Sequence, residues 1–428
     1  MTSEKELVVC AYLPGATESA PVGVLKMTEA GSEVLGASFV YGRRYLERSN
    51  AIEVDPVALG FKAGQQVRDV ELFPRNGLLE FGGIRDAAPD QWGRRVIENL
   101  RRAAPNTLTE SDYLLSAGNN RVGALDIRVG FHAEPNRFVP QIQRLEYLLL
   151  AADAIDNGQA VPAGLHEIFA AGSSMGGMRP KAVVVDEDGK QWLAKFPSTR
   201  DNSFNVPAIE YATMKLAALC GLDVPELRLV DIGQNRKVLL VERFDRVGCN
   251  DQTTRKHFVT ALTLLGLHEA QTVNASYGEL ALSLAKYGVS GTVAVQQAEL
   301  FGRMVFNIFV TNNDDHLRNH GVLWEGTGWK LSPLYDVVPH VEIGIERSLV
   351  LSVGDQGRSA NVSNAMSKYA QFGLDRIAAL AIFDRIWRVV REWKSRFEEF
   401  GVAGKDIELV TGAFRHIDDV GGKTIVRK

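Results

Sequence analysis

The segment TNNDDHLRNHG, residues 311–321, is the densest group of side chains in the sequence that could take part in chemistry. Its carboxamides, carboxylates and two histidines follow directly after the apolar run FGRMVFNIFV at 301–310. Such a composition is typical of a metal site, of a proton-transfer site, or of the polar end of a buried helix. In the last case, Asp315 and Arg318 would only be solvated. The segment by itself leaves all three interpretations open.

The spacing of the donors separates two kinds of metal site. His316 and His320 have the i, i+4 spacing of the zinc motif HExxH, but a leucine replaces its glutamate and no third ligand is obvious. Asp314, Asn319 and Asp336 instead supply oxygen donors, which suit Mg²⁺. Asp314 and Asn319 have the separation of the base and the metal ligand in the kinase catalytic loop HRDxxxxN, and Asp336 follows where a DFG-like aspartate is expected. This order favours phosphoryl transfer.

A lysine and a glutamate upstream fit the same chemistry. Lys195 is the only charged residue of the strand-like run WLAKF, and Glu210 lies among apolar residues of the next helical pattern. In kinases, a strand lysine held by a helix glutamate contacts the α- and β-phosphates of ATP. A solvated lysine on an exposed strand is the competing interpretation. The run LLVERFDR (239–246) is placed either as a hinge that presents backbone groups to adenine or as a plain connection.

The glycine-rich run AGSSMGGMRPKA (171–182) precedes the first of these strands. Consecutive glycines allow the backbone to approach a ligand closely, and their N–H groups can surround phosphate oxygens. The run is not a Walker A loop, because Met178 and Arg179 occupy the Lys-Ser/Thr positions. A flexible hairpin loop is the alternative.

These residues need elements that position them, and the sequence predicts such elements. PVGVLKM and GASFVYGRRYL indicate strands, and residues 86–104 indicate a helix with Pro89 near its first turn and Ile97 and Leu100 on one side. From residue 168 we expect two strands joined by the turn DEDGK, a helix opening near Pro207 and ending at Gly221, and two more strands. Helical patterns dominate from 257, and the last long one repeats apolar residues at helical spacing: Ile377, Leu380, Phe383, Trp387 and Val390.

The composition limits the class of protein. The 428 residues include 45% hydrophobic and 23% charged residues, which is typical of a globular protein with more than one domain. Acidic residues (52) slightly outnumber basic ones (48), so no basic field favours nucleic acid or anionic lipid. Three scattered cysteines favour a reducing compartment, and neither a signal peptide nor a membrane span is expected. We therefore expect a cytoplasmic location and no membrane partner.

Taken together, SSMGGMRPKA, WLAKFPS, AIEYATMKLAALCGL, LLVERFDR, NNDDHLRNHG and LSPLYDVVPH resemble the HipA family, the serine/threonine-kinase toxins of bacterial HipBA toxin–antitoxin systems. The resemblance covers essentially the whole chain. It implies an α+β fold of the protein-kinase-like (PI3/4-kinase-like) bilobal type. The domains would be a small N-terminal α/β subdomain (1–105), an N-lobe (106–245) and a helical C-terminal lobe (246–428).

The resemblance also implies a role for individual residues. Asp314 would be the catalytic base, Asn319 and Asp336 would hold Mg²⁺, and Ser174 or the adjacent Ser173 would be autophosphorylated, which would inactivate the kinase. The loop MGGMRPKA departs from the G-x-Q-x-K-like run of many members. Residues implied to bind ATP are Gly176, Gly177, Lys181, Lys195, Glu210, Glu242, Arg243, Phe244, His316, Asn319 and Asp336.

The family resemblance implies a cellular role as well. The ATP γ-phosphate would go to a serine of an aminoacyl-tRNA synthetase, with glutamyl-tRNA synthetase as the first choice, and translation arrest and persistence would follow. A HipB-like helix-turn-helix antitoxin would be the partner, so that DNA is contacted only through it. The alternatives are a small-molecule kinase on the same fold, a catalytically silent nucleotide-binding co-repressor, and a metal hydrolase built on His316 and His320.

Overall fold

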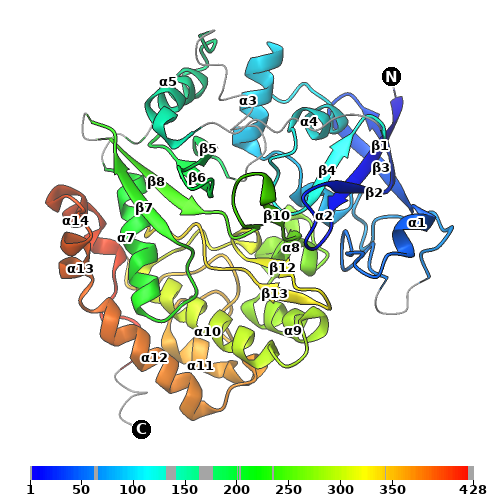
Figure 1. Ribbon diagram of the computed structural model, residues 1–428. Helices are drawn as coiled ribbons and strands as arrows, with labels where there is room; N and C mark the ends of the chain where they lie inside the picture. Colours follow the sequence, from blue (N-terminus) through cyan, green and yellow to red (C-terminus); the bar gives the residue numbers. More distant parts are fainter. Residues whose placement is uncertain are drawn as a thin grey trace. The chain divides into compact units, whose positions relative to one another are not determined.

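The computed structural model describes residues 2–61, 66–131, 141–162, 177–199, 201, 204–233, 236–342 and 344–422. The chain divides into two compact units, each taken by itself below. Unit 1 comprises Met1–Arg200 and Val230–Val259, and unit 2 comprises Asp201–Leu229 and Thr260–Lys428. Both units mix helices and strands (Figure 1), which confirms the α+β class. Ser173, Ser174 and Gly176 lie outside the described residues, and the domain boundaries at 105 and 245 stay predictions.

Unit 1 begins with a four-stranded sheet of order β3-β2-β1-β4. Its strands are β1 (Thr2–Tyr12), β2 (Ser19–Ala30), β3 (Glu33–Tyr41) and β4 (Leu125–Arg128). The pairs β1–β2, β2–β3 and β1–β4 are antiparallel, and burial along β2 alternates as expected for a sheet with one covered face. The strand predicted from PVGVLKM is confirmed, and the one predicted from GASFVYGRRYL is confirmed as far as Tyr41, whereas Arg43–Leu46 form a short helix.

Short helices lie in the chain between β3 and β4: α1 (Arg43–Leu46), α2 (Gly82–Asp86), α3 (Gln91–Arg101) and α4 (Glu110–Ser116). The Asp90 carboxylate accepts the Gly93 N–H and caps α3, so Pro89 lies directly before the cap, near the first turn as the sequence predicted. Ile97 is buried but Leu100 is 51% exposed, because the last turn of α3 is open to solvent.

The second sheet of unit 1 has the order β5-β6-β8-β7. Its strands are β5 (Lys181–Val185), β6 (Gln191–Lys195), β7 (Leu227–Asp231) and β8 (Lys237–Glu242), and the boundary between the units runs through β7. Ala182, Trp192, Ala194 and Leu240 join a core with α3 and α5 (Leu145–Asp156). Because strand residues alternate between faces, residues such as Lys181 and Lys195 belong to the opposite face.

Two short strands, β9 (Arg246–Val247) and β10 (Thr254–Arg255), pair after β8, and β11 (Phe258–Thr260) carries the chain into unit 2. In unit 2, α10 (Val293–Val310) is buried on all sides from Leu300 to its end, and it packs against α9 (Tyr277–Tyr287), α11 (Val362–Ser367) and α12 (Arg376–Val390). A helix that is apolar all round is typical of the centre of a domain. Figure 1 shows these four helices grouped together.

The remaining elements of unit 2 come before, between and after these four helices along the chain. They are α7 (Val206–Leu219), α8 (Ala261–Leu264), the hairpin β12 (Gly321–Trp324) and β13 (Trp329–Leu331), α13 (Trp393–Glu399) and α14 (Gly404–Val410). Helix α7 is capped by Asn205 and has Pro207 in its first turn, as the sequence predicted. Within the described ranges, no helix combines the length and apolarity needed to cross a membrane.

Helix α12 corrects one detail of the predicted apolar stripe. Phe383 and Val390 are buried, as expected, but Ile377 is 80% exposed. Ile377 is the second residue of the helix, ahead of the turns that pack on α10, while Ile386 is fully buried. Helical spacing identifies the apolar face of a helix but does not show at which turn this face begins to pack against another helix.

This pair of isoleucines gives a matched test of the core. We expect Ile386→Ala to lower the free energy of unfolding by about 2–5 kcal/mol, because it leaves a cavity against α10. Ile377→Ala on the same helix should change it by less than about 0.5 kcal/mol. Urea unfolding followed by circular dichroism measures both, and equal losses in the two variants would contradict the packing described.

Candidate functional site

The polar segment after α10 starts from a fixed point. Thr311 ends the helix in the left-handed region, at φ 50°, and its hydroxyl donates to the Ala413 carbonyl. The Thr311 carbonyl accepts the His340 N–H at 2.9 Å. A β-branched residue rarely adopts positive φ, so these hydrogen bonds hold an unfavourable conformation in place. The loop that follows therefore leaves the helix in one direction.

Asp314 is exposed, and hydrogen bonds fix its backbone carbonyl but not its side chain. The Asp314 carbonyl accepts the His316 N–H at 2.9 Å and the Asn319 side-chain amide at 3.0 Å. Among the described residues, no hydrogen bond or ion pair reaches the Asp314 carboxylate. A carboxylate on a rigid loop and open to solvent is what a base needs for taking a proton from an incoming hydroxyl.

Asp315 points the opposite way, into the protein. It is 1% exposed, and its Oδ2 accepts hydrogen bonds from His320 Nε2 at 2.9 Å and from the Tyr277 hydroxyl of α9. Burial acts to raise the pKa of Asp315, but the attraction and hydrogen bonds of His320 and Tyr277 outweigh it and hold this pKa below its ordinary value. Burial and the neighbouring Asp315 charge raise the pKa of Tyr277 well above its usual range. The interpretation of Asp315 as a solvated residue is wrong.

The same contacts decide how the two histidines are used. Because His320 Nε2 is bound to Asp315, His320 belongs to a buried network and does not face a metal together with His316. His316 Nδ1 is buried and has no hydrogen-bond partner among the described groups. Such an atom is satisfied by a water molecule or by a ligand. In the described parts of the chain, no group of three or more His, Cys, Asp or Glu side chains is placed to hold a metal ion.

Asp336 lies in the segment that follows β13 and has φ 59°, a left-handed conformation that costs free energy in a residue other than glycine. Two hydrogen bonds join this segment to the Asp314 loop: Tyr335 Oη donates to the Arg318 carbonyl at 2.7 Å, and Ser332 N donates to the Gly321 carbonyl at 2.8 Å. Asn319 uses its amide nitrogen on Asp314, so its oxygen is the donor left for a cation. Two oxygen ligands from the protein suit Mg²⁺, which keeps waters and phosphate oxygens as its other ligands.

Unit 1 supplies cationic residues. Lys181 and Lys195 are directly paired across β5 and β6, so their side chains share the sheet face opposite the core. Like charges at paired positions destabilise a sheet unless an anion compensates them. Asp90 is 3.7 Å from Lys181 Nζ, and Gly177, at φ 100°, lies so close that a Cβ there would be 2.5 Å from the same nitrogen. The φ of 100° is strained for any residue with a Cβ and therefore favours glycine at position 177. The two lysines make this face suitable for an anionic ligand.

The other predicted residues are placed as follows. Glu210 is buried on α7 in unit 2, whereas Lys195 is in unit 1, and their pairing stays a prediction. Glu242 ends β8 and forms an ion pair with Lys190 at 2.9 Å. The Arg243 N–H donates to the Gln191 carbonyl at 3.1 Å, and the Arg243 carbonyl accepts the Arg246 N–H at 3.2 Å. Adenine contacts at the predicted hinge would therefore depend mainly on the backbone of Glu242 and Phe244.

A comparison with family models gives one match. Residues 173–393 match the family described as "HipA-like C-terminal domain". The match contains the glycine-rich run, the paired strands with both lysines, and the loop with Asp314, Asn319 and Asp336.

Known proteins and structures are similar over different lengths. The "Putative kinase Y4dM" of Sinorhizobium fredii is 27% identical over 214 residues, which are 46% of this chain and 47% of that protein. The "Serine/threonine-protein kinase toxin HipA" of Shewanella oneidensis is 26% identical over 163 residues, 34% of this chain and 37% of that protein. The chain thus spans about half or less of the length of these curated relatives.

A solved structure of the Shewanella oneidensis toxin–antitoxin system, a complex of HipA, HipB and operator DNA, matches with a TM-score of 0.67 and 17% identity. The match covers 98% of this chain and 97% of that chain. The chain therefore has the same fold, as the sequence resemblance implied.

The buried Asp315 network gives a test of the loop. We expect Tyr277→Phe to lower the free energy of unfolding by about 1–3 kcal/mol, because a buried carboxylate loses a hydrogen-bond donor. Tyr287 lies on the same helix and no hydrogen bond to its hydroxyl is seen among the described residues, so Tyr287→Phe is the control and should be near neutral. Chemical denaturation of both variants makes the comparison, and equal stabilities would show that the Tyr277–Asp315 contact does not hold the loop.

Proposed function

We propose, from the premise that this chain belongs to the family defined by the HipA-like C-terminal domain, that it is an ATP-dependent serine/threonine-protein kinase. The observation that carries the proposal is the loop in which an exposed Asp314 is bound through its backbone to Asn319, next to the left-handed Asp336 segment. A base and two oxygen ligands in this order are the residues that kinases use in phosphoryl transfer.

The proposed reaction uses the chain's residues as follows. Asp314 orients the serine hydroxyl of the substrate and takes its proton as the serine oxygen bonds to the γ-phosphorus. The bond from this phosphorus to the bridging oxygen breaks, and ADP leaves with that oxygen. Mg²⁺ held by Asn319 and Asp336 would supply positive charge for the phosphate oxygens. His316, with its unpartnered Nδ1, would contact the nucleotide.

The ATP phosphates would lie against the cationic face of the second sheet. Lys181 and Lys195 supply its positive charges, and the backbone of Gly176 and Gly177 would cover the phosphates. Glu210 would orient Lys195, and the backbone around Glu242, Arg243 and Phe244 would contact adenine. The closeness of Gly177 to Lys181 supports this arrangement, because a backbone without a side chain lies beside the ammonium group.

The substrate and the partner rest on the resemblance to HipA. We propose an aminoacyl-tRNA synthetase as the substrate, glutamyl-tRNA synthetase being the first to test, with translation arrest and persistence as the result in the cytoplasm. A HipB-like helix-turn-helix protein is the proposed antitoxin and would provide the DNA contact. The Shewanella oneidensis structure, in which a HipA of this fold is bound to HipB and operator DNA, supports that partner.

Two other functions use the same site. A small-molecule kinase would transfer phosphate to an amino sugar or a lipid head group rather than to a protein. A silent co-repressor would bind nucleotide without transferring phosphate. The exposed Asp314 carboxylate disfavours the silent form, because a pure binding site does not need a base.

The first test of the proposed function is phosphate transfer to the chain itself. After incubation with Mg²⁺ and ATP, we expect the intact mass of the wild type to rise by one phosphate, and Asp314→Asn to slow this by at least about 100-fold because the base is lost. Asp384→Asn, which breaks a surface ion pair with Arg388, should react like the wild type. An unchanged rate in Asp314→Asn would contradict the role of Asp314. If the wild type gains no phosphate even after phosphatase treatment, the silent alternative is favoured.

The predicted modification site gives a second test. A phosphate on Ser174 would add nearly two negative charges beside the residues proposed to bind ATP phosphates, so it should block ATP binding and switch the kinase off. We expect Ser174→Ala to keep transferring phosphate to a protein substrate after long incubation with ATP, while the wild type loses activity. Ser173→Ala is the matched control. If Ser174→Ala loses activity at the wild-type rate and Ser173→Ala does not, the modified residue is Ser173.

A further inference from the structure

The chain that leaves β8 is held by a buried group of charged side chains. Arg243 donates to both oxygens of the Asp245 carboxylate, at 3.0 and 2.8 Å, and Arg246 donates to Asp245 Oδ2 at 2.7 Å. All three residues are less than 10% exposed. Burial acts to raise the pKa of Asp245, but the charges of Arg243 and Arg246 outweigh it and the pKa lies below its ordinary value. The carboxylate is therefore ionised whenever the unit is folded near neutral pH.

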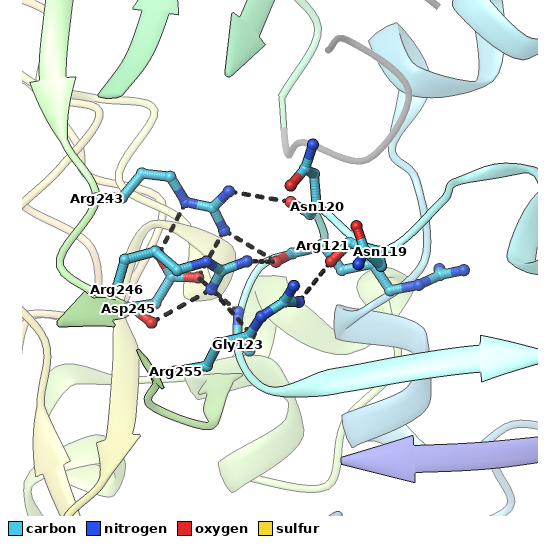
Figure 2. A network of polar contacts seen from close by, with 8 residues as sticks. All are labelled: Asn119, Asn120, Arg121, Gly123, Arg243, Asp245, Arg246 and Arg255. Carbon is cyan, nitrogen blue, oxygen red and sulfur yellow. Dashed lines mark hydrogen bonds and ion pairs between the residues drawn. The ribbon is translucent and has the colours of Figure 1, made fainter. Parts of the chain in front are cut away.

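The second half of this network is a loop more than a hundred residues earlier in the chain. Figure 2 shows the Arg243 and Arg246 side chains facing the backbone of Asn119–Gly123. Arg243 donates to the carbonyls of Asn120 (3.1 Å) and Arg121 (2.9 Å), and Arg246 donates to those of Arg121 (2.7 Å) and Gly123 (3.0 Å).

Two further contacts close the network. The Gly123 N–H donates to Asp245 Oδ2 at 2.7 Å. Arg255 of β10 donates to the Asn119 carbonyl and stacks over the Tyr12 ring at 3.7 Å. We call the whole arrangement the arginine clasp: Arg243, Asp245, Arg246 and Arg255 with the backbone of Asn119–Gly123.

The charges of the arginine clasp do not balance by themselves. Two arginines, Arg243 and Arg246, share one carboxylate, Asp245. Arg255 is bound to the Asn119 carbonyl instead, and burial lowers its pKa to about 10. The negative ends that compensate the surplus are carbonyl oxygens, and four of them come from the Asn119–Gly123 loop. A buried arginine that loses such partners is strongly unfavourable. The segment after β8 is therefore fixed only while this loop is in place.

We propose that the arginine clasp positions the backbone of Glu242 and Phe244 for recognition of the nucleotide base, so that Asp245, Arg243 and Arg255 are positioning residues for adenine selectivity. The inference rests on the proposed function. Arg243 lies between the two backbone groups in question, and the arginine clasp fixes its side chain while its N–H is bound to the Gln191 carbonyl. A shift of the arginine clasp would move the backbone of Glu242 and Phe244 together with Arg243, because both are joined to Arg243 by peptide bonds.

The proposal separates base recognition from phosphate binding. The paired lysines, Asn319 and Asp336 would contact groups that ATP and GTP share, whereas a positioned hinge distinguishes the two bases through donor and acceptor groups at their edges. A loosened clasp should therefore reduce the preference for ATP over GTP more than it reduces affinity for the triphosphate.

The experiment measures dissociation constants of Mg²⁺-ATP and Mg²⁺-GTP by titration calorimetry for the wild type, Arg243→Lys and Arg255→Lys. Each lysine keeps the charge, but Arg243→Lys loses the two-pronged contact with Asp245 and Arg255→Lys loses the guanidinium contacts with the Asn119 carbonyl and the Tyr12 ring. Asp153→Asn is the control, since it breaks another Arg–carboxylate pair of unit 1, with Arg236 at 2.7 and 2.8 Å. Thermal melting shows whether each variant is folded. If Arg243→Lys does not fold, the milder variant Arg255→Lys carries the comparison.

We expect the wild type to prefer ATP, the two clasp variants to lose about ten-fold of that preference, and the control to keep it. A folded Arg243→Lys or Arg255→Lys with the wild-type ratio would overturn the positioning role while leaving the proposed function intact. A wild type that binds both nucleotides equally overturns it too. A wild type that binds neither nucleotide overturns the proposed function itself, and the role of the clasp with it.

Discussion

The Asp315 carboxylate is buried and accepts hydrogen bonds from Tyr277 and His320, and the geometry of the polar loop depends on this contact. Removing the hydrogen-bond donors of a buried carboxylate costs several kcal/mol, which is a large part of the free energy of unfolding of a typical protein. The loop therefore cannot rotate so that Asp315 is exposed and Asp314 buried. Asp314, its neighbour in sequence, is thereby left exposed. The hydrogen bond between Asp315 and His320 closes the segment 315–320, and Asn319 lies within this segment. Asp314 and Asn319, the proposed base and the proposed metal ligand, therefore keep one position relative to each other.

Unit 1 uses the same physical device at a different place. Asp245 is a buried carboxylate that collects Arg243 and Arg246, and the surplus positive charge is compensated by backbone carbonyls. In both units a buried carboxylate holds a backbone segment. The groups for which we propose a function lie next to this carboxylate in the sequence and do not include it. On the second sheet the arrangement differs, since Lys181 and Lys195 are paired like charges and the Asp90 carboxylate lies 3.7 Å from Lys181 Nζ.

Much of this could be predicted from the sequence. Alternating burial gives the strands, apolar spacing gives α7, α10 and α12, and the order Lys195, Glu210, Asp314, Asn319, Asp336 indicates the chemistry. The inward direction of Asp315 could not be predicted, because two adjacent aspartates are identical in the sequence and the deciding hydroxyl is 38 residues away. The arginine clasp depends on a loop separated from Asp245 by 122 residues. Counting outward from the DEDGK turn, by contrast, would have paired Lys181 with Lys195.

The proposed function requires that Lys181, Lys195, Asn319 and Asp336 bind the same Mg²⁺-nucleotide. A crystal structure of the chain with Mg²⁺ and a non-hydrolysable ATP analogue tests it most directly. We predict that the Asn319 oxygen and the Asp336 carboxylate bind the metal, that Lys181 and Lys195 contact phosphate oxygens, and that the Asp314 carboxylate faces the γ-phosphate. An analogue bound away from these residues, or a metal held by His316 without Asp336, would contradict the account.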